Sequence, residues 1–353
     1  MSRSFSLITL WLWSAWNVQA FMHRSDSNKS FRLSHPLNAV GVLVKKAKEA
    51  ALREYIAGGI EDEVMEQYNK IKSVRDEPLK VSKEMGALQA DLTRRKGTIT
   101  VIAEYKRKLI DSGYIKEVFE PAILSNEFRE FGASAIAVMC DERMGGCTYD
   151  DLKTFVEDQR RNRNAVPGPI KIINNDLIID ELQIARTAAC GAHAAVITLG
   201  IVGAEVTETL LKACQAVNIE AIVAVTNKEE AQQAVDLGAT MISIINVDGV
   251  DPKVELVQDL NIPEGRVVTT IVNIRARMDK GLEEVEEAWA CRDKGFNCAW
   301  ISDALYKAGN SVNEHPGAII KSMKSKSSLR WASPVAQSGR GEGAREYLGD
   351  ILM

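Results

Sequence analysis

Eight short apolar runs, each separated from the next by a helical pattern, constrain the fold of this chain more than any other feature. In the segments between the runs, apolar residues recur at helical spacing. Strands that alternate with helices pair in parallel, because each helix returns the chain to the same edge of the sheet. The runs predicted as strands are Ile99–Glu104, Ala135–Met139, Ile170–Ile173, Ala194–Leu199, Ala221–Val225, Met241–Ile245, Val267–Ile271 and Cys298–Ile301.

The number of strand–helix units and a glycine repeat favour a closed sheet. Eight units are the complement of one TIM (β/α)8 barrel. A glycine precedes every second predicted strand, at Gly132, Gly191, Gly238 and Gly295, where a helix C-cap or tight turn uses positive φ. The rival is a doubly wound open sheet, which usually carries a Gly-rich phosphate loop after its first strand, and this sequence has none there. The predicted fold class is therefore α/β, a TIM (β/α)8 barrel.

Local composition divides the chain into five segments. The first has a positive charge, an apolar run and small residues at its end, as a signal peptide does. The second is basic and Ser-rich, and the third has apolar residues at helical spacing. We predict a signal peptide in 1–20, a transit-like segment in 21–35, an N-terminal helical extension in 36–96, the barrel in 97–326, and a linker with a C-terminal tail in 327–353.

The residues around the expected cleavage site indicate a destination. Phe21 directly follows Ala20, the last of the small residues, and leads into the basic segment. This arrangement resembles the bipartite presequence of algae with secondary plastids, and the resemblance implies a plastid (chloroplast) stroma. Ordinary secretion is the weaker option, and so is a membrane anchor, because the apolar run is short for a bilayer span. We expect no membrane association after processing.

Composition argues against several classes of partner and ligand. The formal net charge is −4, too close to neutral to indicate nucleic-acid binding. The six cysteines form no CxxC pair, and the four histidines show no metal-ligand spacing. The sequence therefore predicts buried thiols in a reducing compartment, with no metal and no cofactor.

The last ten residues, 344–353, form a short amphipathic segment with Leu348, Ile351 and Leu352 as apolar anchors. Such a segment can lay its apolar face in the groove of a protein partner. A frayed tail, or a helix packed on its own barrel, is at least as well supported.

The first predicted strand ends in charged residues. Glu104 and Lys106 point to the same side, because side chains alternate along a strand. The C-terminal ends of the strands are where an α/β barrel keeps its catalytic groups. The sequence therefore marks these two residues as candidate catalytic groups, with a solvated ion pair as the equally supported alternative.

Three stretches resemble one family, the indole-3-glycerol-phosphate synthases of tryptophan biosynthesis. They are Ile102–Lys108, Gly132–Arg143 and Asn175–Ile184, and the resemblance runs from about residue 40 to about residue 323. It implies a TIM barrel with a helical extension and a carboxy-lyase without a cofactor. The implied substrate is small and phosphorylated, and its indole ring closes with loss of carbon dioxide and water.

This copy departs from the family at most of the positions that the resemblance marks as functional. Glu104 and Lys106 match the family's glutamate and lysine. Asn175 stands for the catalytic lysine of the third strand, and Ala224 stands for the glutamate of the fifth. The other replaced positions are Ile245 and Thr270, which lose an asparagine and a glutamate, and the degenerate phosphate-binding positions Val272, Ser302 and Asp303.

Neither an amide nor a methyl group can transfer a proton near neutral pH, so the losses at Asn175 and Ala224 bear directly on catalysis. We therefore expect a barrel of this family that is weak or inactive in its ring-closing decarboxylation, a pseudoenzyme. Three alternatives stay open. They are an active divergent lyase that uses Glu104 and Lys106, a non-catalytic binding or scaffold protein of the plastid, and an enzyme of another reaction on the same scaffold.

Overall fold

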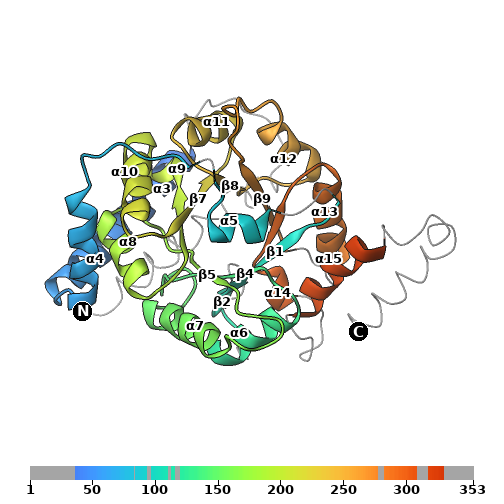
Figure 1. Ribbon diagram of the computed structural model, residues 1–353, viewed down its shortest axis with the longest axis horizontal. Coiled ribbons are helices and arrows are strands. Elements are labelled where there is room, and N and C mark those ends of the chain that lie inside the picture. The colour runs from blue at the N-terminus through green and yellow to red at the C-terminus, as the bar shows by residue number, and fades with distance from the viewer. Residues whose placement is uncertain are drawn as a thin grey trace, which may run out of the picture.

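The barrel is closed by eight parallel strands, which neighbour one another in the order β1-β10-β9-β8-β7-β6-β5-β4 (Figure 1). The computed structural model describes residues 36–82, 84–93, 97–109, 113–115, 120–276, 282–307 and 317–329. The predicted TIM barrel is thus confirmed. The barrel strands are β1 (Thr100–Tyr105), β4 (Ala135–Val138), β5 (Lys171–Asn174), β6 (Ala194–Thr198), β7 (Glu220–Val225), β8 (Met241–Ile244), β9 (Thr269–Ile274) and β10 (Cys298–Ile301).

Helices surround the strands, and a two-stranded antiparallel ribbon of β2 (Lys108–Leu109) and β3 (Gly113–Tyr114) follows β1. Helix α7 illustrates how local sequence sets a helix start: Thr148 and Asp151 form a reciprocal capping box at its N-terminus. The outer helices are α6 (Pro121–Glu130), α7 (Tyr149–Arg161), α8 (Glu181–Ala189), α9 (Leu199–Val202), α10 (Ala204–Ala216), α11 (Lys228–Asp236), α12 (Val250–Val257), α13 (Leu282–Asp293), α14 (Ala304–Lys307) and α15 (Gly317–Leu329).

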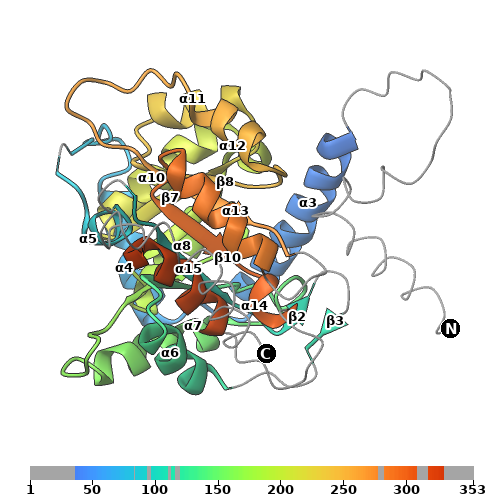
Figure 2. The same cartoon turned by 90° about the vertical axis from the view of Figure 1, so that its right-hand side faces the viewer.

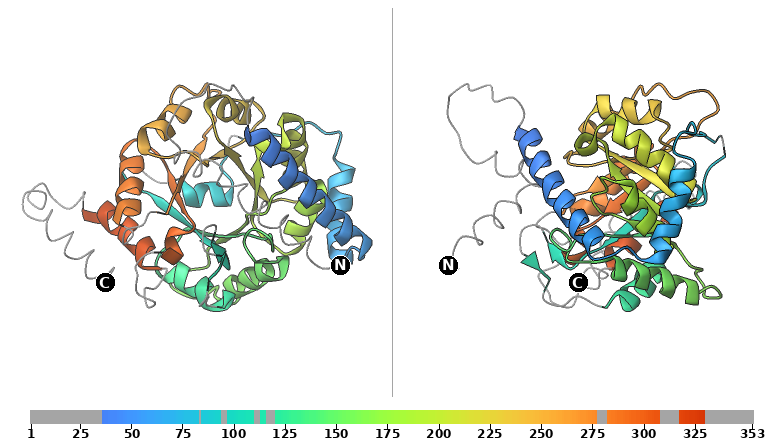
Figure 3. Two further views of the ribbon diagram at one scale, coloured as in Figure 1. Left: turned by 180° about the vertical axis from the view of Figure 1, so that it is seen from behind. Right: turned by 90° about the vertical axis from the view of Figure 1, so that its left-hand side faces the viewer.

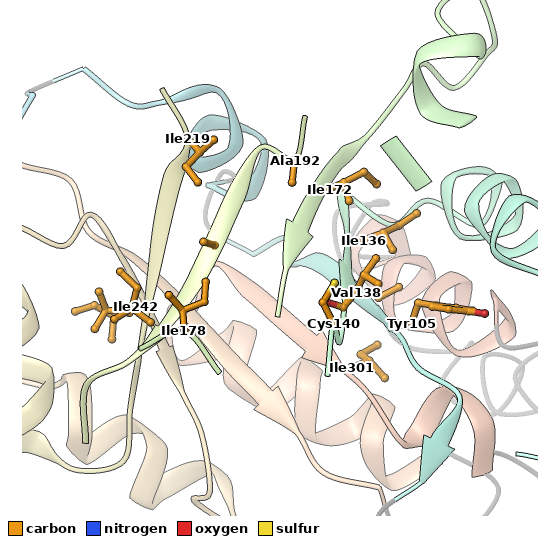
Figure 4. Packing of buried hydrophobic residues seen from close by; sticks show 14 of the residues in the cluster. Tyr105, Ile136, Val138, Cys140, Ile172, Ile178, Ala192, Ile219, Ile242 and Ile301 are labelled. Atoms are coloured by element: carbon orange, nitrogen blue, oxygen red, sulfur yellow. The ribbon is translucent and has the colours of Figure 1, made fainter. Parts of the chain in front are cut away.

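Two buried apolar clusters follow from the alternation of side chains along the strands. The outer cluster fills the space between the strands and the helices, where Tyr105, Ile136 and Val138 pack together (Figure 4). The inner cluster fills the barrel and includes Ile102, Ile271 and several alanines. Because the inner cluster occupies the middle of the barrel, polar side chains can face the interior at the strand ends.

The extension caps the barrel at both ends. Helix α3 (Pro36–Ala57) lies at the C-terminal end of the strands, and α5 (Ala87–Leu92) lies at the opposite end (Figure 2). Viewed from the C-terminal end of the strands, α3 crosses the rim of the barrel (Figure 3). Leu88 and Leu92 of α5 belong to the inner cluster, so α5 closes the N-terminal end with apolar side chains. Helix α4 (Asp62–Ser73) packs on α8.

Most predicted strands agree with the observed strands to within one residue at each end, and the larger differences lie at β9 and at the end of the barrel. Strand β9 begins two residues later than predicted and runs on through Asn273 to Ile274, because it pairs with all of β10. Helix α15 ends at Leu329, three residues beyond the expected end of the barrel at 326. The predicted segments 1–20, 21–35 and 344–353 lie outside the described residues. Among the helices that are described, none is long and apolar enough to span a bilayer.

Candidate functional site

The C-terminal end of β1 brings Glu104 and Lys106 together, as the sequence predicts. All six residues of β1 are buried, and Glu104 faces the barrel interior from the same side as Ile102. Glu104 and Lys106 are each only 2% exposed. They are therefore buried groups and not the solvated ion pair of the alternative reading.

The carboxylate of Glu104 is surrounded by donors from its own chain. Its Oε2 accepts hydrogen bonds from Asn175 Nδ2 at 3.0 Å and from Trp300 Nε1 at 2.7 Å. Its Oε1 accepts one from Ser302 Oγ at 2.6 Å and lies 3.5 Å from Lys106 Nζ. An ionised carboxylate offers about four lone-pair positions; Asn175, Trp300 and Ser302 donate to three of them, and the Lys106 ammonium lies close to Oε1.

Lys106 is held by Asp303, whose Oδ1 forms an ion pair with Nζ, and by the more distant Glu104. Burial alone would lower the pKa of Lys106, but these two carboxylates outweigh it and raise the pKa above its usual value. Tyr306 of α14 fixes the backbone here, since its hydroxyl donates to Glu104 O at 2.9 Å and accepts from Lys106 N at 3.3 Å. The two carboxylates thus favour the charged form of Lys106.

Five of the positions expected to have lost catalytic or phosphate-binding groups lie at the same end of the barrel. Asn175 reaches Glu104, and Ala224 and Ile245 belong to the inner cluster, so all three face the barrel interior near its C-terminal end. Ser302 and Asp303 follow β10 directly and contact the Glu104–Lys106 pair. These five residues therefore lie at or just after the C-terminal ends of their strands.

Thr270 and Val272 lie elsewhere than the sequence placed them. Thr270 pairs with Ile242 in the N-terminal half of β9, and its hydroxyl bonds Asn297 Oδ1 at 3.2 Å. Val272 packs in the outer cluster. Since β9 runs on past Val272, the residue that faces the interior beside Trp300 is Asn273.

Trp300 was not anticipated as a site residue. It is 3% exposed and belongs to the inner cluster. Bulky branched residues usually fill such an interior, whereas here the cluster combines one indole with four alanines, which are Ala135, Ala137, Ala194 and Ala224. The sequence signal was available, because Trp300 stands two residues before Ser302 and so shares its side of the strand.

A second charged cluster lies at the same end of the barrel, and its lysine was not anticipated from the sequence. Lys48 of α3 pairs with Asp141 Oδ2 at 3.0 Å and with Asp176 Oδ1. Burial raises the pKa of Asp176 to about 6, and Lys48 only partly opposes this. Burial would also raise the pKa of Asp141, but Lys48 lowers it below its usual value. No motif near Lys48 marked it, because its partners stand 93 and 128 residues away.

The described ranges contain no group of three or more His, Cys, Asp or Glu side chains arranged to hold a metal ion. All six cysteines are free, and five of them are buried. Burial raises the pKa of Cys147 to about 12 and that of Cys214 to about 12, so these thiols behave as core side chains.

Comparison with known proteins supports the family resemblance. Residues 54–314 match the family described as indole-3-glycerol phosphate synthase. The indole-3-glycerol phosphate synthase of Leptospira interrogans is 31% identical over 147 residues, covering 42% of this chain and 55% of the relative. The chain thus spans about half the length of that relative. The synthases of Chlorobaculum tepidum and Opitutus terrae are 27% and 26% identical and cover 61% and 67% of this chain, and 78% and 85% of those relatives.

Proposed function

This chain belongs to the indole-3-glycerol phosphate synthase family, and we propose that it is a member whose ring-closing decarboxylation is weak or absent. The family connects it with tryptophan biosynthesis. A small phosphorylated substrate is the ligand class that the family implies. The proposal concerns what this particular set of side chains does with such a substrate.

The proposal rests on the Glu104 carboxylate, which already accepts hydrogen bonds from donors of its own chain. A catalytic carboxylate must accept a proton or a hydrogen bond from the substrate. Asn175, Trp300 and Ser302 already donate to Glu104, and Lys106 faces its remaining lone pair. A substrate can reach this carboxylate only by displacing a donor of the protein, and that loses the free energy of a buried hydrogen bond.

The neighbouring positions supply no replacement. Ala224 and Ile245 present hydrocarbon to the interior where the resemblance implies a carboxylate and an amide. A single missing acid or base typically lowers the rate by ~10²–10⁴. We call the C-terminal end of the barrel interior the mouth. Its described part therefore keeps one buried acid–base pair, Glu104 and Lys106, and has lost the groups that would work with it.

The test is a steady-state assay of indole-3-glycerol phosphate formation from the carboxyphenylamino deoxyribulose phosphate. We expect no turnover from the folded wild-type chain and measurable turnover from an Asn175→Lys, Ala224→Glu double variant. Lys106→Ala in each background is the control. Wild-type turnover that Lys106→Ala abolishes would instead establish an active divergent lyase that uses Glu104 and Lys106.

We further propose that the chain acts in a plastid stroma, from the presequence-like residues 1–35. Residues 344–353 are proposed to dock on a protein partner if the barrel is a scaffold. A fluorescent fusion of the first 40 residues tests the destination. Pull-down with and without residues 344–353 tests the docking. Fluorescence in the secretory pathway alone, or unchanged capture by the truncated chain, would contradict these two assignments.

A further inference from the structure

Helix α3 is attached to the barrel with little apolar burial. Among residues 41–57, every residue keeps appreciable exposure, and Val42, Leu43 and Ile56 are about half exposed. Only Leu52 and Tyr55 are partly buried against the outer cluster. Packing of an amphipathic face normally supplies most of the stability of a protein helix, so polar contacts must contribute much of the attachment of α3.

The barrel presents two carboxylates to Lys48. Asp141, in the loop after β4, is oriented by the backbone N–H groups of Arg143 and Met144, which donate to its Oδ1 at 2.9 and 3.1 Å. Its other oxygen, Oδ2, accepts from Lys48 Nζ. The Asp141 carboxylate is therefore oriented by donors of its own loop, without a contact from α3.

Asp176 is positioned in the same way from the other side. Tyr149 Oη and Gln183 Nε2 donate to its Oδ2 at 3.0 and 3.1 Å, and its Oδ1 is left for Lys48. Asp141 and Asp176 thus form a binding site for an ammonium group, and the extension supplies that group as Lys48. We call this pair of carboxylates the receptor. The Lys48 side chain is 14% exposed, so the pair sits at a boundary that water can reach.

Two further contacts lie along the same helix. The Arg186 guanidinium lies 4.1 Å from the ring centroids of both Tyr55 of α3 and Tyr149 of α7. Arg143 Nη1 donates to Ala47 O at 3.2 Å. Tyr149 thus contacts both the Asp176 receptor and the stacked guanidinium, which joins the two attachment points.

The receptor is adjacent in sequence to the mouth of the barrel. Asn175 precedes Asp176; its backbone N–H donates to Val138 O at 2.9 Å, and its Nδ2 donates to Glu104 at 3.0 Å. We propose that α3 is a strap docked by Lys48, and that Lys48 is a positioning residue which, through Asp176 and Asn175, sets the hydrogen bonds of Glu104. This assignment stands whether or not the barrel turns over a substrate.

The test compares Lys48→Met with Lys46→Met in the full chain. Lys46 is an exposed lysine on the same helix, which makes it a matched control. Hydrogen exchange of 41–57 reports docking. The ¹H–¹⁵N resonance of the Trp300 indole, assigned with Trp300→Phe, reports the mouth, because Trp300 donates to the same Glu104 oxygen as Asn175.

We expect Lys48→Met to speed exchange across 41–57 at least about tenfold and to shift the Trp300 resonance, since releasing α3 frees Asp176. Lys46→Met changes neither, and Lys48→Arg restores both. Equal exchange in Lys48→Met and Lys46→Met overturns the strap. Faster exchange with an unmoved Trp300 resonance overturns the positioning role. If Lys48→Met does not fold, Asp141→Asn removes one carboxylate charge of the receptor and is judged by the same two readouts.

Discussion

Two lysines at the same end of the barrel each stand between two carboxylates, and they differ in what surrounds them. Lys106 lies between Glu104 and Asp303 on the barrel side and is 2% exposed. Lys48 comes from a helix outside the barrel and is 14% exposed. Similar charge arrangements therefore have different roles. The cluster around Lys106 fills the interior at the mouth, and the cluster around Lys48 attaches α3 to the rim of the barrel.

The neighbours Asn175 and Asp176 connect the two clusters. Asn175 donates to Glu104, whereas Asp176 accepts from Lys48. Successive side chains point to opposite faces of a strand, and this alternation continues past the end of β5. The comparison teaches that the hydrogen bonds of Glu104 inside the barrel are only one residue away from the attachment site of α3.

The largest effect is expected from Lys106→Met. It leaves two carboxylates without their ammonium in a buried site, and breaking a buried pair in this way costs about 3–5 kcal/mol. Denaturant unfolding of the variant measures the loss. Adding Asp303→Asn should recover part of it, because one uncompensated charge is removed. A loss below about 1 kcal/mol would mean that the pair behaves like the exposed ones and would erase the contrast with Lys48.

The pH dependence of stability should carry the signature of Asp176. Its pKa, about 6 in the folded chain, lies above the usual value of 3.8, so between these two values the folded state binds a proton that the unfolded state releases. The stabilisation from this group is complete below about pH 4 and is lost as the pH rises through about 6. Unfolding of wild type and Asp176→Asn between pH 4 and 7 isolates it. If the free energy of unfolding of the wild type increases relative to that of Asp176→Asn as the pH rises, the assignment is contradicted.

The smallest effect is expected at Tyr55. Removing its ring in Tyr55→Leu takes away one face of the Arg186 stack, and such contacts contribute about 0.5–1 kcal/mol at partly exposed sites. Hydrogen exchange of 41–57 should rise less than in Lys48→Met. Tyr55→Phe keeps the ring and serves as the control. If the Leu and Phe variants exchange equally, the stack contributes nothing to holding α3.

Much of the barrel was predictable because each strand is a contiguous apolar run, and strand ends follow from where the run stops. That Glu104 and Lys106 share one side of the chain followed from the two-residue period, whereas Asn175 was singled out by the family resemblance. Strand β9 shows the limit of this reasoning. The predicted run ended at Ile271, whereas the strand continues through Asn273 to Ile274. The run therefore did not mark which residue reaches the mouth, and pairing with β10 identifies Asn273.

The contacts that close the mouth could not be read from the sequence in the same way. Trp300 reaches Glu104 across 196 residues and Lys48 reaches Asp176 across 128. Such pairs form only once the barrel has closed and the extension has folded back onto it. Local patterns report burial and direction but not which distant partner arrives there.

The most direct measurement is a single-turnover reaction with the folded full chain in excess over the carboxyphenylamino deoxyribulose phosphate, followed by indole fluorescence. Protein in excess, raised until the amount of product no longer depends on its concentration, removes weak binding as an explanation and isolates the chemical step. Because Glu104 already accepts hydrogen bonds from its own chain, we expect no product beyond that formed with Lys106→Ala under the same conditions. Product that appears with wild type, and depends on Lys106, would contradict the account and show that the buried pair still performs the family reaction.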